Sequence, residues 1–376
     1  MGSAVRALEF RDPARGRALA RTLARLTQEI GRNPVSVMHV CGSHEQAIAR
    51  FGLRASFPHA LEVIMGPGCP VCVTDLPEVD EAVALALQGV RVATYGDIVR
   101  VRGTARSLAD AQAEGGRIDV VYSVTQAIEL ARRSDEEVVF FATGFETTAV
   151  ATAAALLDDP PPNLSILSAH KFIPPVMEIV AEMPATRVEG FLAAGHAATI
   201  TGSAIFEAFV AQHGIPVVIA GFEPLDILAG LARLLELIRD GMPRVANMYP
   251  RCVTDAGNRV AQERLWRVFR AVGGCWRGIA HVPNGNLRLR DEWAARDARR
   301  RFRIDLGRAV DGTPHTLAPQ CICGDIMAGI ASPDRCPLFG TRCTPQSPVG
   351  ACMVSSEGTC RIWHEYGGHP DLGATA

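Results

Sequence analysis

The chain has 376 residues, of which 48% are hydrophobic and 21% are charged, and its formal net charge is −2. A chain of this size and composition predicts a globular protein of two or three domains, so its cysteines are not needed to staple a small core. A net charge of −2 does not indicate a nucleic-acid-binding protein. We interpret the basic run at residues 296–303 as a solvated helix face or a protein-docking surface.

The N-terminal segment alternates charged and apolar residues, so we expect no signal peptide. The longest apolar stretch, residues 138–157, contains Gly144, Glu146 and four threonines, and it predicts a strand, a loop and a helix rather than a membrane span. We therefore expect a cytoplasmic protein. Its eleven cysteines should be thiols, metal ligands or transient redox pairs rather than permanent disulfides.

A helix is predicted at residues 15–31, and a repeated pattern of strand, polar turn and helix follows it. The predicted strands cover residues 35–40, 61–65, 90–95, 119–124, 138–142, 164–169, 188–195 and 216–221. This alternation favours parallel sheets of the doubly wound kind. From about residue 247 the rhythm stops; helices are predicted at 259–272 and 291–302, followed by a cysteine-rich tail.

The segment CGSHE follows the first predicted strand. Cys41 closes the strand, Gly42 allows a close backbone approach, and His44 comes three residues later. A Cys–His pair can be a nucleophile with its base, or two ligands of a metal such as iron. The competing interpretation is that Cys41 is simply a small buried residue.

The segment GPGCPVCVT follows the second predicted strand and contains Cys69 and Cys72. A C-x-x-C next to a βα unit predicts a redox pair. Asp75 and Glu78 resemble a capping box at the start of the next helix, whose positive end favours the thiolate form of nearby cysteines. The competing interpretation is a buried turn with inert sulfurs. A dinucleotide fingerprint is rejected because position 71 is Val.

The segment GFETT places Glu146 at the start of a predicted helix, where its charge suits the helix dipole. A catalytic role and a simple capping role are both open for Glu146. His170 and His196 also follow strands, and we interpret them as loop or core residues. Cys252 and Cys275 are interpreted as structural, and no P-loop is present.

The tail contains six cysteines, at positions 321, 323, 336, 343, 352 and 360. Their spacing matches neither zinc knuckles nor ferredoxins, but six sulfurs can provide four cluster ligands and two further thiols. We favour a [4Fe–4S] cluster over zinc or no metal. If Cys321, Cys336, Cys343 and Cys360 are the ligands, then Cys323 and Cys352 remain, although spacing alone does not decide between Cys352 and Cys360.

These observations predict an α/β fold with two similar doubly wound parallel-sheet domains and a smaller, mainly helical iron–sulfur lobe. The predicted domains are residues 32–130, residues 131–246, and a lobe of residues 247–376 to which the helix of residues 1–31 can be added. Functional groups of open α/β sheets collect beyond the carboxyl ends of the strands, where CGSHE, CPVC and GFETT all fall.

CGSHE, GPGCPVCVT, TGFETT and the tail CICGDI…RCPLFG…CTPQSPVGACMVSSEGTC together resemble the HypD family of hydrogenase maturation factors, over about residues 30–366. The resemblance implies two α/β domains and a third lobe with a [4Fe–4S] cluster. It also implies a complex with a small HypC-type chaperone, in which the two proteins hold Fe(CN)2CO for a [NiFe] hydrogenase. A HypE-type partner, loaded by a HypF-type protein, would deliver the cyanide.

By this resemblance Cys41 is the iron ligand, His44 assists ligation or proton supply, and Cys69 and Cys72 are the redox-active pair. The cluster ligands would be Cys321, Cys336, Cys343 and Cys360, and the electron-relaying dithiol Cys323 and Cys352. We therefore expect an assembly scaffold with redox chemistry, without nucleic acid or a membrane span. The alternatives are an Fe–S-dependent protein disulfide reductase and a zinc-stapled interaction protein, neither of which requires Cys41 and His44.

Overall fold

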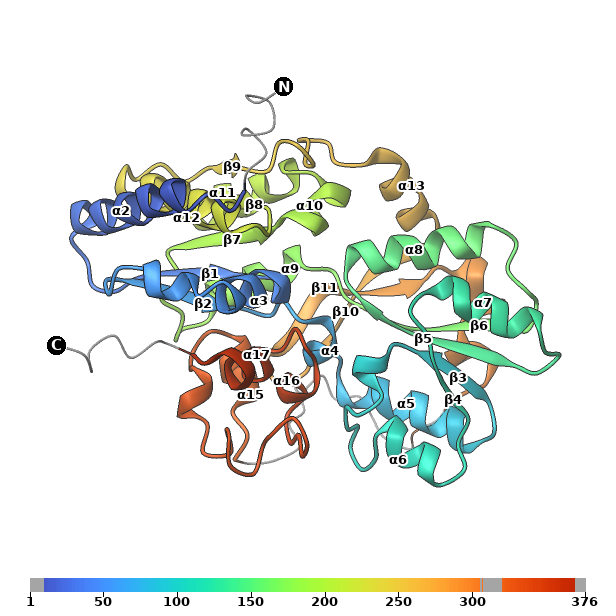
Figure 1. Ribbon diagram of the computed structural model, residues 1–376. Coiled ribbons are helices and arrows are strands. Elements are labelled where there is room, and N and C mark those ends of the chain that lie inside the picture. The colour runs from blue at the N-terminus through green and yellow to red at the C-terminus, as the bar shows by residue number, and fades with distance from the viewer. Residues whose placement is uncertain (1–9, 305, 307–319, 369–376) are drawn as a thin grey trace. The chain divides into compact units, whose positions relative to one another are not determined.

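The computed structural model describes residues 10–304, 306 and 320–368 (Figure 1). It divides into two compact units, each made of segments that are distant in the sequence. The first unit combines residues 1–68, 180–258 and 362–376, and the second combines residues 69–179 and 259–361. Each unit has its own parallel sheet, so the predicted α/β class with parallel sheets is confirmed.

The sheet of the first unit has the strand order β2-β1-β7-β8-β9 and is parallel throughout. Its strands are β1 (Val35–His39), β2 (Leu61–Met65), β7 (Gly190–Ala194), β8 (Val217–Ala220) and β9 (Val245–Asn247). Every residue of β1, β7 and β8 is buried, as expected for parallel strands covered on both faces. The short strand β9 is absent from the sequence prediction.

Helix α2 (Pro13–Ile30) packs against α12 (Pro224–Arg239) in the first unit. The Asp12 carboxylate accepts a hydrogen bond from the Ala14 amide at 2.7 Å at the N-terminus of α2, and Gly31 ends the helix with φ of 71°. The predicted N-terminal helix is therefore confirmed, but it belongs to this unit and not to the cysteine-rich lobe. The other α-helices of this unit are α3 (Gly42–Arg50), α10 (Gly195–Thr201) and α11 (Glu207–His213).

The sheet of the second unit has the order β4-β3-β5-β6 and is also parallel. Its strands are β3 (Arg91–Thr94), β4 (Ile118–Val120), β5 (Val138–Gly144) and β6 (Leu164–His170). Its helices in this part are α4 (Pro70–Val73), α5 (Leu76–Leu87), α6 (Leu108–Ala113), α7 (Val124–Arg132) and α8 (Glu146–Leu157), while α9 (Pro174–Glu182) runs through residues of both units. The strand predicted at residues 119–124 ends early, because the Ser123 hydroxyl caps α7.

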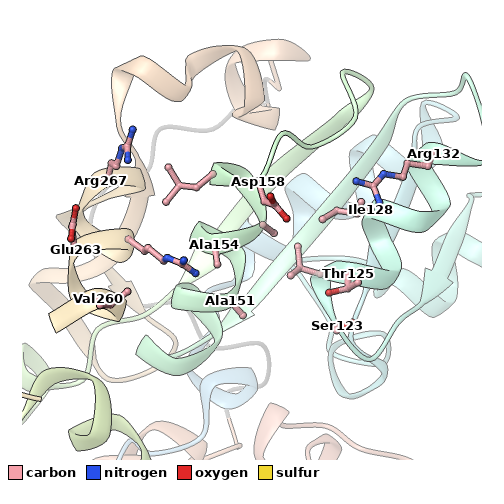
Figure 2. Close-up of a pocket in the computed structure, with 14 residues that line it drawn as sticks. Ser123, Thr125, Ile128, Arg132, Ala151, Ala154, Asp158, Val260, Glu263 and Arg267 are labelled. Atoms are coloured by element: carbon pink, nitrogen blue, oxygen red, sulfur yellow. The ribbon is translucent and has the colours of Figure 1, made fainter. Parts of the chain in front are cut away.

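After α13 (Arg259–Val268) the chain forms an antiparallel hairpin of β10 (Phe269–Trp276) and β11 (Ala280–Leu289), which contacts β6. The predicted helix at 259–272 therefore stops at Val268, since pairing with β11 overrides the local helical pattern. The helix predicted at 291–302 is a 3-10 turn (Asp291–Arg296) followed by α14 (Ala298–Arg301). Helices α7, α8 and α13 border a surface pocket (Figure 2).

The cysteine-rich tail contributes α15 (Cys323–Met327), α16 (Ala351–Val354) and α17 (Thr359–Tyr366). The predicted continuous domains differ from the observed units. Strands β7 and β8, which were assigned to a second domain, pair with β1 and with each other in the first sheet. Strands β3 and β4, which were assigned to the first domain, lie in the second sheet. Pairing between distant segments causes this difference, and local sequence carries no signal for it.

Candidate functional site

Cys41 lies at the carboxyl edge of the first sheet, as the N-cap of α3 directly after β1. Its Sγ lies 3.3 Å from Nε2 of His196, which follows β7. Since β1 and β7 are neighbouring parallel strands, their carboxyl ends bring these two side chains together. A thiol in contact with an imidazole can transfer its proton to that imidazole and become a thiolate, the form that binds metals.

His44 is fully buried one turn into α3, and its Nε2 lies 3.0 Å from the Gly221 carbonyl after β8. Burial, together with the neighbouring His39, lowers the pKa of His44 to about 3, so the ring is neutral at pH 7. A neutral ring that donates from Nε2 carries a lone pair on Nδ1, and that buried atom has no hydrogen-bond partner within residues 10–304, 306 and 320–368. His44 can therefore offer Nδ1 to a hydrogen-bond donor or a metal ion.

Phe222 lies between the two histidines. The His196 ring stacks on Phe222 at a centroid distance of 5.3 Å, and the His44 ring lies against Phe222 at 4.8 Å. By packing on both imidazoles, the aromatic ring restricts their orientation. The candidate centre in this unit therefore consists of Cys41, His44, His196 and Phe222.

A buried polar network supports the loop that carries Cys41. The Glu45 carboxylate lies 2.9 Å from His39 Nε2, accepts bonds of 2.6 Å from Arg54 and accepts a bond of 2.9 Å from the Trp363 indole. Burial alone would raise the pKa of Glu45, but the Arg54 guanidinium and the bond to His39 outweigh it and hold this pKa far below its usual range. His39 Nδ1 in turn lies 3.1 Å from the Cys41 carbonyl, so this network fixes the backbone at Cys41.

Gly68 packs directly on the backbone of Cys41. Its carbonyl accepts a 3.0 Å hydrogen bond from the Gly42 amide, and a Cβ at position 68 would lie 2.2 Å from the Cys41 nitrogen. No side chain fits in that space, so glycine is required at position 68 for this close approach.

In the second unit, Cys69 and Cys72 form a disulfide with an S–S distance of 2.15 Å. Cys69 is the N-cap of α4, and the Cys72 amide lies 3.2 Å from Cys69 Sγ. Cys72 Sγ lies 3.9 Å from the Ala351 carbonyl, and α4 packs against α16, the helix that contains Cys352. The CPVC turn is thus placed beside the cysteine tail within one unit; its redox activity remains a prediction.

The buried Arg277 guanidinium holds the chain after the disulfide. Its Nε donates to the Thr74 carbonyl at 2.7 Å, and its backbone amide donates to the Val73 carbonyl at 3.1 Å. The next residues begin α5, where the predicted capping box of Asp75 and Glu78 is confirmed. The turn that contains Cys69 and Cys72 is therefore anchored at its C-terminal side by the β10–β11 hairpin.

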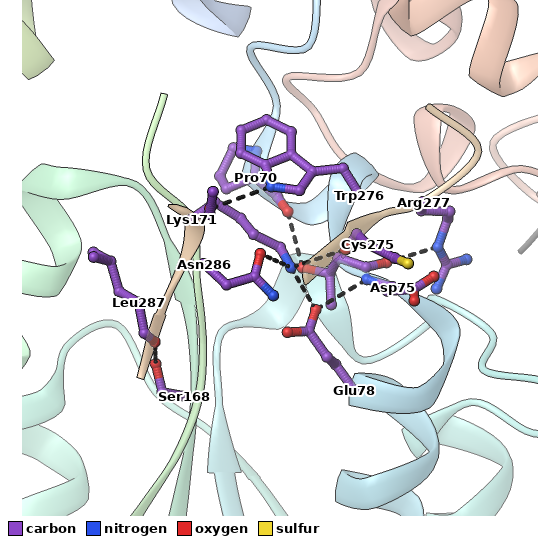
Figure 3. A network of polar contacts seen from close by, with 12 residues as sticks. Pro70, Asp75, Glu78, Ser168, Lys171, Cys275, Trp276, Arg277, Asn286 and Leu287 are labelled. Carbon is purple, nitrogen blue, oxygen red and sulfur yellow. Dashed lines mark hydrogen bonds and ion pairs between the residues drawn. The ribbon is translucent and has the colours of Figure 1, made fainter. Parts of the chain in front are cut away.

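Figure 3 shows a buried charge network behind this turn. Lys171 Nζ donates to Glu78 at 2.8 Å and to Asn286 at 3.0 Å, and it lies 3.4 Å from the Cys275 carbonyl. Burial would raise the pKa of Glu78, but the charges of Lys171 and Arg288 outweigh it and lower this pKa to about 2, whereas burial lowers the pKa of Lys171. Lys171 is the only lysine in the sequence, so this network contains its only side-chain ammonium group.

The six tail cysteines are gathered in the second unit. Cys323 forms hydrogen bonds with Cys321 and Cys352, and Cys352 also bonds Cys360; Cys336 and Cys343 interact electrostatically with members of this group. A Cβ at Gly350 would lie 3.0 Å from Cys321 Sγ, so glycine leaves room beside the sulfurs. Thiols are the donors that an Fe–S cluster requires, and in this respect the residues fit such a group.

The geometry is a weaker indication than the donor chemistry. No three His, Cys, Asp or Glu side chains in the described part of the chain are arranged to hold a metal ion. The described thiols bond one another in the pairs Cys321–Cys323, Cys323–Cys352 and Cys352–Cys360. Six thiols in one lobe far exceed what packing requires, and thiolates are the ligands of an Fe–S cluster.

Glu146 begins α8 at the end of β5, and its carboxylate accepts a 2.8 Å hydrogen bond from the Ile173 amide. Helix α4 contacts β5, so the GFETT segment lies close to the CPVC turn. His170 is buried and bonds Thr152 at 3.0 Å, as expected for a core residue.

Sequence reasoning missed His196 as a partner of Cys41, although its position after a strand end was the available signal. It also missed Phe222, Lys171 and Arg277, whose roles arise from contacts across the fold. The structure brings Cys41, His44 and His196 together in one unit, and Cys69, Cys72 and the tail cysteines together in the other.

Comparison with known proteins gives a consistent picture. Residues 15–367 match the HypD family model, which is described as "Hydrogenase formation hypA family". The chain is 39% identical to a hydrogenase maturation factor HypD of Azotobacter vinelandii over 372 residues, which covers 96% of both chains. It is 40% identical to the HypD of Rhizobium leguminosarum bv. viciae, with 96% of this chain and 94% of the relative covered.

The HypD of Rhodobacter capsulatus is 39% identical over 371 residues, covering 96% of this chain and 98% of the relative. Among the helices in the described ranges, none has the length and hydropathy needed to cross a membrane. Given a family match over nearly the whole length and relatives of this identity, the chain belongs to the HypD family of hydrogenase maturation factors.

Proposed function

We propose that the chain is a scaffold on which the Fe(CN)2CO group of [NiFe] hydrogenase is assembled. A HypC-type chaperone would bind the iron jointly with the chain, and a HypE-type partner, loaded by a HypF-type protein, would deliver cyanide. The observation that carries this proposal is the 3.3 Å contact between Cys41 Sγ and His196 Nε2, beside the buried, neutral His44.

The cargo iron needs a thiolate, and the Cys41 thiol becomes one when His196 accepts its proton at Nε2. The resulting soft ligand suits low-spin iron, and a cysteine of the HypC-type partner would supply a second thiolate. His44 Nδ1 is available to accept a hydrogen bond near the incoming ligands. Phe222 packs on both imidazole rings and keeps them in place beside Cys41.

The second unit would supply reducing equivalents by thiol–disulfide exchange. A thiolate of the Cys323–Cys352 pair attacks the Cys69–Cys72 disulfide, whose bond breaks as a mixed disulfide forms. The other thiol of the Cys323–Cys352 pair then attacks this mixed disulfide and displaces the sulfur of the CPVC turn. Cys323 and Cys352 are left as a disulfide, and Cys69 and Cys72 are left as two thiols. Two electrons and two protons move in this exchange. The packing of α4 on α16 supports it.

Cys321, Cys336, Cys343 and Cys360 would hold the [4Fe–4S] cluster. When bound, it would supply one-electron redox chemistry beside the dithiol. Gly350 leaves the sulfur of Cys321 accessible at the edge of this group, and Arg277 contributes positive charge near Cys323.

Infrared spectroscopy of the anaerobically purified protein, co-expressed with its HypC-type chaperone, tests the proposal. Cyanide and carbon monoxide stretching bands are expected in the wild type and should be lost in Cys41→Ala, while the iron and sulfide of the cluster stay at wild-type levels. Cys252→Ala is the control for the loss of one thiol, because Cys252 is exposed and is neither part of the Cys41 centre nor one of the tail cysteines. Retention of the bands in Cys41→Ala would contradict the assignment of Cys41.

The second candidate is an Fe–S-dependent protein disulfide reductase, which the Cys69–Cys72 disulfide beside α16 favours. It predicts repeated reduction of a disulfide substrate without bound mononuclear iron. Absent infrared bands in a preparation with an intact cluster, combined with such turnover, would decide for this candidate.

A further inference from the structure

The pocket between α7, α8 and α13 in the second unit is a groove that none of the chemistry above uses. Its volume is about 890 Å³, which corresponds to roughly two turns of a helix with a diameter of about 10 Å. In Figure 2, α8 runs along the floor and carries Ala151 and Ala154, while α13 and α7 form the two walls.

Each of the three helices contributes a single stripe of residues at helical spacing. Most lining positions follow this spacing: 151, 154, 155 and 158 in α8 and directly after it, 260, 263, 264 and 267 in α13, and 125, 128 and 132 in α7; positions 123, 124 and 157 also line the groove. Residues spaced by three and four lie on one helix face, so the groove is a continuous channel between three ridges. Small alanines on its floor allow another helix to approach closely.

The walls are rich in arginine. Arg132 on α7 and Arg267 on α13 stand on opposite walls, and Arg264 also lines the groove (Figure 2). None of these three arginines forms an ion pair with any described residue, whereas other surface arginines do, such as Arg117 with Glu136. Since Asp158 and Glu263 supply only two negative charges, the groove is cationic on a chain whose net charge is −2.

The groove also exposes apolar surface. Val260 is 61% exposed on the α13 wall, and Ile128 and Leu157 complete the apolar lining. An apolar floor between cationic walls is complementary to an amphipathic helix whose apolar face is flanked by carboxylates. Small anions would satisfy the arginines but would leave the apolar floor uncovered.

We propose that this groove is a docking site for an acidic amphipathic helix of a partner protein. The helix would lie along α8 with its small apolar residues on Ala151 and Ala154, and its carboxylates would reach Arg132 on one side and Arg267 on the other. The surface is independent of the cysteine chemistry of the same unit.

The test is fluorescence anisotropy with the full chain and two labelled helical peptides of about four turns. One peptide has an alanine–leucine face flanked by glutamates, and the other has lysines in place of the glutamates. We expect saturable binding of the acidic peptide that weakens with salt, and no binding of the basic peptide. Equal binding of both peptides, or binding of neither, would overturn the proposal.

Neighbouring arginines provide a matched pair of variants. Arg132→Glu and Arg267→Glu should each weaken binding of the acidic peptide by at least about fivefold, whereas Arg133→Glu, at the C-cap of α7 and outside the groove, should stay within about twofold. Ala154→Trp fills the floor without changing the charge and should abolish binding. Circular dichroism of each variant confirms that the fold is retained.

Two further measurements exclude the other occupants. If inorganic phosphate displaced the acidic peptide from the wild type, and if the Ala154→Trp variant still bound phosphate, the groove would be an anion site and the proposal would fail. If sedimentation showed self-association that Arg267→Glu abolished, a second copy of the chain would be the occupant instead.

Discussion

Replacement of the buried Lys171 tests how much its ion pair with Glu78 stabilises the fold behind the CPVC turn. In Lys171→Met the aliphatic stem is conserved, but Glu78 loses its closest cation, which lies at 2.8 Å. Glu78 keeps Arg288 at 3.0 Å and its bond to the Asp75 amide, so its charge is only partly uncompensated. We therefore expect destabilisation without loss of the fold.

The magnitude follows from the contacts of Glu78. Breaking a buried ion pair from one side costs about 3–5 kcal/mol, and the remaining Arg288 contact points to the lower end of that range. The lowered pKa of Glu78, about 2, shows that the surrounding cations, chiefly Lys171 and Arg288, outweigh burial and favour the charged carboxylate in the folded protein. Lys171→Met should therefore lower the free energy of unfolding by about 3 kcal/mol.

Lys171→Arg should also destabilise the protein, by about 1–3 kcal/mol, because a planar guanidinium must fit a site that is filled by a compact ammonium with three partners. Urea unfolding followed by tryptophan fluorescence measures both variants, since Trp276 lies beside the network. Arg117→Met, which removes an exposed ion pair, is the control and should leave the urea midpoint unchanged. A Lys171→Met midpoint equal to that of the control would refute the argument.

Three further outcomes follow from contacts described above. In Gly68→Ala the new Cβ would lie 2.2 Å from the Cys41 nitrogen, so the variant should lose about 2 kcal/mol in urea unfolding and its Cys41 should be alkylated faster than in the wild type. Because the pKa of Glu78 is lowered in the folded protein, ionised Glu78 stabilises the fold at pH values above about 4.3, the pKa of a glutamate in the unfolded chain, and this stabilisation is lost as the pH falls toward 2. The difference in urea midpoint between wild type and Glu78→Gln should therefore shrink between about pH 5 and pH 2. A difference that stays constant over this range would contradict the argument. Mass spectrometry after alkylation should find Cys69 labelled without reductant in Cys72→Ala but only after reduction in the wild type, and labelling of unreduced wild type would count against the disulfide.

Local sequence was sufficient for the parts of the fold that depend on short-range patterns. The eight predicted strands all exist, because each is a compact apolar run that ends in a polar turn. The capping box at Asp75 and Glu78 was predictable for the same reason, since it depends on two residues three positions apart. The residues 1–9, 305, 307–319 and 369–376, which include part of the predicted lobe, lie outside the described part of the chain.

Sequence reasoning failed where pairing joins distant segments. Nothing near residue 190 indicates that β7 pairs with β1 rather than with β6, yet this pairing brings His196 to Cys41. The β10–β11 hairpin was missed because RVAQERLWRVFRAV has a helical pattern, and only pairing with Ala280–Leu289 makes its last four residues, from Phe269, part of a strand. The motif cysteines could be selected from sequence, but their partners could not.

The hairpin also explains how the CPVC turn and the cysteine tail, separated by about 250 residues, come to lie in one unit. Arg277 near its tip binds the carbonyls of Val73 and Thr74, directly after the disulfide. The neighbouring Gly278 packs closely on Gly324, because a Cβ at position 324 would lie 2.0 Å from the Gly278 carbonyl oxygen. Gly324 directly follows Cys323. One tight turn thus fixes both the disulfide and the start of the thiol group. The geometry of any exchange between Cys69–Cys72 and Cys323–Cys352 is therefore set by a segment that contains neither pair.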